Sequence, residues 1–77
     1  MNMTNITAMA RARSMIEVIC HSLVPGLAYR NKEMADGYIA SIYDAGLIDR
    51  NQFEDLKAEV EMAFTTWTVK TGFDKHV

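Results

Sequence analysis

Residues 43–53 of the chain read YDAGLIDRNQF, and this stretch decides the fold because one helix stops in it and the next begins. Gly46 stands where a helix-terminating glycine belongs, since glycine adopts the left-handed backbone conformation without a Cβ penalty. Ile42 and Leu47 are then placed as the apolar pair that commonly closes such an ending. We therefore predict that a helix ends at Ala45.

The start signal of the following helix comes three residues after Gly46. Asp49 is predicted to be its N-cap, because an aspartate carboxylate can accept hydrogen bonds from the free amides of the first turn. Gln52 can reach back to the Asp49 backbone, as in a capping box, and Ile48 and Phe53 flank these positions as a hydrophobic staple. Each signal contributes on the order of 0.5–1 kcal/mol. Together they predict a tight antiparallel helical hairpin.

The hairpin pattern also has a resemblance. Residues 39–64, with the core D-A-G-L-I-D-x-x-Q-F-x-x-L, are similar to the short helical hairpins of SHOCT-type modules, which lie at the ends of many bacterial proteins. The resemblance implies the hairpin and carries no activity with it.

Helical periodicity accounts for the remaining sequence. A first helix, capped by Thr4 or Asn5, precedes the break at Pro25-Gly26. The second helix starts near Pro25 or, alternatively, later with Asn31 as its cap; we prefer the longer helix. We predict one all-α, three-helix domain over residues 1–77, with helices at 5–22, 26–45 and 50–71 and a frayed tail at 74–77.

Each predicted helix has an apolar face that is expected to form the core. In chain order, the faces are Met9, Ala12, Ile16, Ile19, Cys20 and Leu23; Leu27, Met34, Tyr38, Ile42 and Ala45; and Phe53, Leu56, Val60, Ala63, Phe64 and Trp67.

Cysteine content and hydropathy bear on location. The single cysteine cannot form an intramolecular disulfide, which is typical of proteins in a reducing compartment. The first ten residues lack the pattern of a signal peptide. The longest uncharged runs, Val18–Tyr29 and Ala63–Val69, are too short to span a bilayer. We expect a soluble, cytoplasmic protein with no membrane partner.

The residue types that carry catalysis are poorly placed. Cys20 and His21 are adjacent, so on a helix their side chains diverge by about 100°, and Cys20 belongs to the apolar face. The chain offers no set of soft ligands for zinc and no glycine-rich phosphate loop. We expect no enzymatic activity, no metal and no cofactor.

Charge is divided unevenly along the chain. Residues 1–32 carry four basic residues against Glu17, whereas residues 33–62 carry eight acidic residues against Arg50 and Lys57. Either the two parts attract one another, within the fold or across a dimer, or the acidic part faces a basic partner.

Large apolar side chains outside the predicted core faces favour a protein-interaction function, through another protein or a second copy, and we expect the chain to form a homodimer. The chain is similar in type to the accessory and inhibitor proteins of bacteriophages and mobile elements. A protein of this type would bind a host protein complex and inhibit or modulate it. The expected partner-binding residues are Val18, Tyr43, Glu54, Asp55, Glu59 and Met62.

A small DNA-binding transcriptional regulator is the alternative. It would use Arg11, Arg13 and Arg30, the basic residues of the N-terminal part. Against it, the helix after Gly46 is acidic, which is the wrong sign for the phosphate-lined major groove. Nucleic acid is therefore the less favoured partner.

Overall fold

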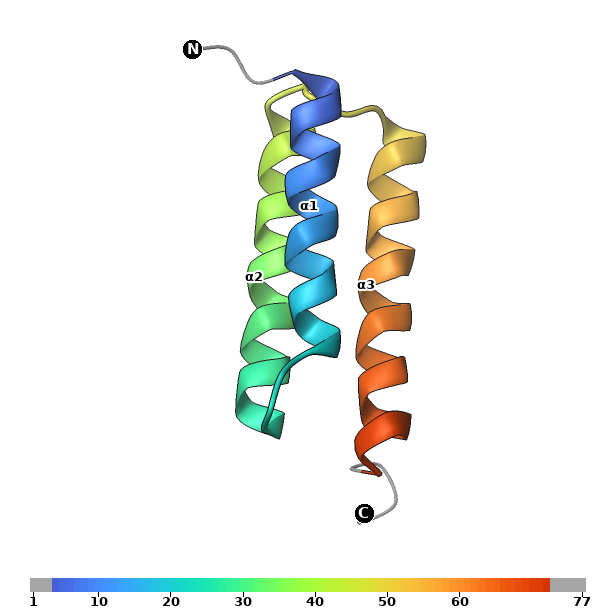
Figure 1. Cartoon of the computed structure of the whole chain (residues 1–77). Coiled ribbons are helices and arrows are strands. Elements are labelled where there is room, and N and C mark those ends of the chain that lie inside the picture. The colour runs from blue at the N-terminus through green and yellow to red at the C-terminus, as the bar shows by residue number, and fades with distance from the viewer. Residues whose placement is uncertain (1–3, 73–77) are drawn as a thin grey trace.

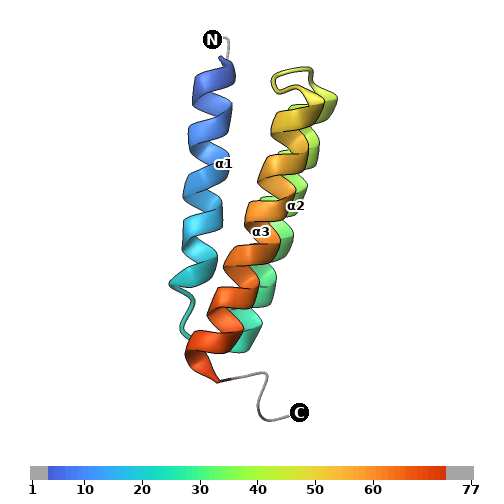
Figure 2. The same ribbon diagram turned by 90° about the vertical axis from the view of Figure 1, so that its right-hand side faces the viewer.

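Three α-helices make up the structure, a computed structural model that describes residues 4–72. They are α1 (Asn5–Cys20), α2 (Pro25–Asp44) and α3 (Arg50–Thr71). Figures 1 and 2 show the helices side by side, with the chain reversing direction at each turn. Every pair of helices is in contact. The predicted all-α three-helix fold is confirmed, while the tail predicted at 74–77 lies outside the described residues.

The turn between α2 and α3 has the predicted hydrogen bonds. The Leu47 amide donates to the Ile42 carbonyl at 2.9 Å, and the Gly46 amide donates to the Tyr43 carbonyl at 3.0 Å. Gly46 has a φ of 75°. This is a Schellman ending, and α2 ends one residue earlier than predicted, with Ala45 as its C-cap.

The start of α3 also has the predicted cap, and α1 is joined to it. Asp49 Oδ1 accepts from the Gln52 amide at 2.7 Å, and Gln52 Oε1 accepts from the Asp49 amide at 3.0 Å. The Asn5 and Gln52 side-chain amides then bond to each other, at 2.8 and 3.0 Å. Asn5 Nδ2 also donates to the Leu47 carbonyl at 2.8 Å. The hairpin turn therefore holds the first turn of α1.

The turn between α1 and α2 corrects one predicted boundary. Thr4 caps α1 as expected, but this helix ends at Cys20 rather than at residue 22. The Ser22 hydroxyl folds back instead and donates to the Val18 carbonyl at 3.1 Å. Helix α2 begins at Pro25, as in the longer of the two alternatives, because proline suits a first helical position where no amide donor is needed.

The core is rich in alanine, and this corrects the predicted apolar faces of α1 and α2. Ala28 and Ala35 are fully buried, whereas Leu27 and Met34 are 45% and 52% exposed. Small side chains let two helices approach closely, so larger neighbours remain at the edge of the contact. Leu23, predicted in the core, lies in the turn and is 88% exposed. The buried apolar residues are Ala8, Ala12, Ile16, Ile19, Ala28, Ala35, Ile39, Ile42, Ile48, Leu56, Val60, Ala63 and Trp67.

Candidate functional site

The line along which two helices meet is here called a seam. Ionised side chains bridge the seam between α1 and α3. Arg13 reaches Glu59 through Nε at 3.2 Å and Nη2 at 2.9 Å. This two-point contact raises the pKa of Arg13. On the same seam the Cys20 thiol donates to the Ala63 carbonyl at 3.8 Å.

The seam between α2 and α3 is bridged in the same way. Lys32 contacts Glu61 at 3.0 Å and Asp36 at 3.3 Å. Asp36 also accepts from Lys57 at 3.1 Å. The attraction that the sequence predicts between its basic and acidic parts is therefore realised in part within one chain.

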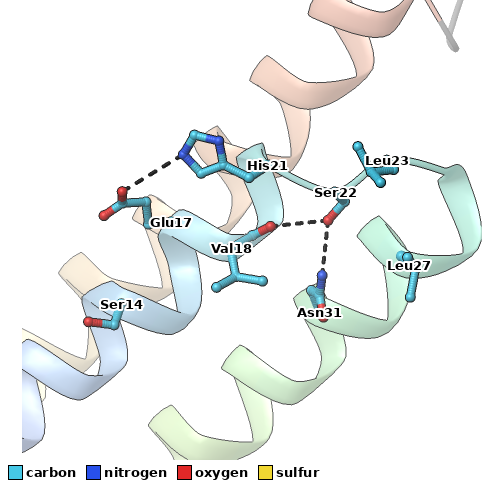
Figure 3. Close-up of a pocket in the computed structure, with 8 residues that line it drawn as sticks. All are labelled: Ser14, Glu17, Val18, His21, Ser22, Leu23, Leu27 and Asn31. Atoms are coloured by element: carbon cyan, nitrogen blue, oxygen red, sulfur yellow. Dashed lines mark hydrogen bonds and ion pairs between the residues drawn. The ribbon is translucent and has the colours of Figure 1, made fainter.

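The seam between α1 and α2 is different, because within residues 4–72 no ion pair crosses it. Asn31 donates to the Ser22 hydroxyl at 3.0 Å, near the turn (Figure 3). Around this bridge lies a groove of about 440 Å³, here called the α1/α2 groove. It is lined by Ser14, Glu17, Val18, His21, Ser22, Leu23, Leu27 and Asn31.

A second hollow extends this apolar surface along the two helices. It has a volume of about 120 Å³ and is lined by Met15, Val18, Asn31 and Met34. Val18 and Asn31 line both hollows, so the two lie next to each other. Figure 3 shows Val18 directed into the space between α1 and α2. Val18 is 50% exposed, comparable to Leu27 and Met34 on the opposite wall.

Two kinds of charge stand near the groove. Glu17 and His21 face each other along α1, with 3.8 Å between Oε1 and Nε2, on the side of the helix away from α2 (Figure 3). Arg11 and Arg30 are exposed. No residue in 4–72 forms an ion pair with either arginine.

The expected partner-binding residues are distributed over different parts of the molecule. Val18 lines the groove. Tyr43 is half-buried and stacks on Phe53, with 4.3 Å between ring centroids. Glu59 is held by Arg13. These three residues therefore do not share one surface.

The other three expected residues lie on α3. Glu54 pairs with Arg50 at 3.2 Å, and Asp55 is exposed. Met62 is 68% exposed. Asp55 and Met62 are seven residues apart, so they share one face of the helix. Sequence reasoning missed Leu27, which lines the groove, and Met34, which lines the second hollow, because their helical spacing assigned them to the core.

The three arginines of the DNA-binding alternative do not all lie on one side of the molecule. Arg13 turns toward α3, where it meets Glu59. Arg11 is two residues away, which is about 200° around the helix. Arg30 belongs to α2. Arg11 and Arg13 therefore do not belong to one basic patch.

The arrangement of Cys20 and His21 follows the sequence-based expectation. The Cys20 sulfur faces the Ala63 carbonyl, whereas the His21 ring pairs with Glu17. Over residues 4–72 there is no cluster of three or more histidine, cysteine or acidic side chains that could bind a metal ion. Within the same residues, no helix combines the length and apolar character needed to cross a bilayer.

Comparisons with protein families, with curated proteins and with solved structures found no match for this chain.

Proposed function

We propose that this chain is a non-enzymatic interaction protein that binds a helical segment of another protein in the α1/α2 groove. Support comes from the contrast between the seams. Those on either side of α3 are bridged by ion pairs, whereas the α1/α2 seam exposes Val18, Leu27 and Met34 and has no ion pair across it among residues 4–72. Apolar surface that a fold leaves beside a hollow is typical of a protein-binding surface.

The spacing of the groove residues suits a helix. Met15 and Val18 are three residues apart on α1, and Leu27 and Met34 are seven apart on α2. Each pair thus forms a row along its helix. An amphipathic helix placed between the two rows could insert its apolar anchors at i, i+3 or i+4, and i+7. Methionine on both walls would adapt to anchors of different shape.

A protein without catalytic chemistry acts on its partner by occupying a surface. Binding in the groove would block or tether the bound helix. This is the action expected of an accessory protein from a bacteriophage or mobile element that inhibits or modulates a host protein complex.

The test uses the full chain labelled with ¹⁵N and a helical peptide that carries leucines at i, i+3 and i+7 with glutamine on its flanks. Binding is expected to shift the amide signals of Val18, Leu27, Asn31 and Met34. Val18→Glu should abolish binding, because it places a charge in the apolar groove. Met62→Glu is the matched control on α3 and should still bind.

Far-UV circular dichroism establishes that both variants keep their helices. Signal changes centred on Met62, or equal binding by Val18→Glu and the unmodified chain, would contradict the proposed groove.

A further inference from the structure

We propose that the helix bound in the α1/α2 groove has acidic flanks, which Arg11 and Arg30 contact. This inference rests on the proposed function of the groove and names the chemistry of the partner. It begins from the pairing of charges within the chain. Four basic residues pair with acids of their own chain: Arg13 with Glu59, Lys32 with Asp36 and Glu61, Arg50 with Glu54, and Lys57 with Asp36.

The remaining basic residues of the described chain are Arg11, Arg30 and Lys70, and none of them has an ion-pair partner in residues 4–72. Lys70 lies in the last turn of α3. A cation there interacts favourably with the helix dipole. Among the basic residues of the described range 4–72, this leaves Arg11 and Arg30 with neither an ion-pair partner nor a place in the last turn of a helix.

Helical spacing places both of these arginines on the same side of their helices as residues that line the two hollows, although neither arginine lines a hollow itself. Arg11 precedes Met15 by four residues and Val18 by seven, and residues at these intervals share a helix face. Arg30 follows Leu27 by three residues and precedes Met34 by four. The carboxylate that lines the groove belongs to Glu17, which is turned toward His21 (Figure 3). Apart from Glu17 and His21, which pair with each other, the charged side chains that helical spacing places along the two rows are Arg11 and Arg30.

A second copy of the chain fits this surface less well than an acidic helix. Two grooves facing each other would bring Arg11 and Arg30 of one copy near those of the other, and like charges repel. Arg13 and Lys32, which could attract the acidic part of another copy, already pair with Glu59 and Glu61. A foreign helix with carboxylates supplies the missing charge. Arginine suits it because the guanidinium can contact both carboxylate oxygens.

The experiment compares three peptides with the same apolar face and with glutamic acid, glutamine or lysine on the flanks. Binding to the full chain is measured by fluorescence anisotropy at low and high salt. At low salt the glutamate peptide is expected to bind about fivefold tighter than the glutamine peptide, as for two exposed ion pairs. The preference should shrink as salt screens the charges.

Variants connect the preference to the two arginines. The double variant Arg11→Gln/Arg30→Gln should bind the glutamate and glutamine peptides equally. Arg50→Gln removes an exposed arginine at the start of α3 and should keep the full preference. Circular dichroism establishes that both variants remain folded.

The other possible outcomes contradict one proposal or both. If all three peptides bound equally, or if the lysine peptide bound most tightly, the proposed groove would still stand but the proposal of an acidic partner would be wrong. Failure of all three to bind would overturn both proposals. Binding of a DNA duplex that depends on Arg11 and Arg30 would replace the acidic helix with nucleic acid. Sedimentation equilibrium should give a monomer mass; a dimer that Val18→Glu dissociates would make a second copy the occupant.

Discussion

The Trp67 indole donates a hydrogen bond of 2.9 Å from Nε1 to the carbonyl oxygen of Ser22. Ser22 lies in the turn between α1 and α2, and Trp67 lies near the end of α3. The indole is 2% exposed. This bond therefore connects the last turns of α3 to the end of the molecule that carries the α1/α2 groove.

Replacing Trp67 should destabilise the fold. Trp67→Phe leaves the Ser22 carbonyl without this donor and places a smaller ring in the core. The free energy of unfolding should therefore fall by about 1–3 kcal/mol. Urea unfolding followed by circular dichroism measures the change. Val69→Ala, at a position 60% exposed on the same helix, is the control and should change little. In the parent chain, emission from this tryptophan at the wavelength of the free amino acid would contradict its burial.

Two glycines should respond to alanine with opposite signs. Gly46 has a φ of 75°, so Gly46→Ala should cost about 1 kcal/mol through left-handed strain. Gly37 lies inside α2, and a Cβ there would meet no atom within 4 Å apart from its chain neighbours and the adjoining helix backbone. Gly37→Ala should therefore stabilise by about 0.5–1 kcal/mol. Thermal unfolding of both variants tests these two expectations. If both substitutions shifted the melting temperature in the same direction, left-handed strain at Gly46 would not explain the effect.

The N-cap of α3 should be worth a measurable amount. Asp49→Ala removes the carboxylate that accepts from the Gln52 amide, and the cost is expected to be about 0.5–2 kcal/mol. Asp55→Ala removes an exposed carboxylate from the same helix without removing a cap, so it should stay within about 0.5 kcal/mol of the parent. Chemical denaturation of the two variants compares them; equal stability would argue against the cap.

Leu56 should be among the most costly positions to truncate. Its side chain is fully buried, so Leu56→Ala loses apolar burial and leaves a cavity, at a cost of about 2–4 kcal/mol. Met62→Ala, at an exposed position of the same helix, should cost less than about 0.5 kcal/mol. Comparable unfolding midpoints for these two variants would contradict the assignment of the core face of α3.

Alkaline pH should weaken the seam between α2 and α3. The hydrogen bond that Lys32 donates to Glu61, with further contributions from Asp36, raises the pKa of Lys32 above its usual value of 10.5. The stabilisation is fully present below the unfolded-state pKa and is lost as pH rises through the folded-state pKa. Lys32→Arg keeps its charge there. The parent should therefore lose more stability than Lys32→Arg between pH 9 and 11.5, measured by urea unfolding; parallel losses would count against this role of Lys32.

The sequence alone determined the helical hairpin, because its signals act over short distances. Gly46 bonds to Tyr43, and Asp49 bonds to Gln52, so each partner lies within one turn of the chain. The same holds for Thr4, whose hydroxyl accepts from the Thr7 amide. Local chemistry of this kind places a helix end to within one or two residues without knowledge of what packs against it.

Tertiary structure decided which side of each helix is covered. In α2, residues 27 and 34 and residues 28 and 35 have the same helical spacing, so periodicity cannot choose between the larger pair and the alanines. The helices approach closely at Ala28 and Ala35, so these alanines are buried and Leu27 and Met34 remain at the surface. Arg13 and Glu59 likewise meet from 46 positions apart. The α1/α2 groove also depends on contacts between residues far apart in the sequence, because it forms between two packed helices that no ion pair joins within residues 4–72.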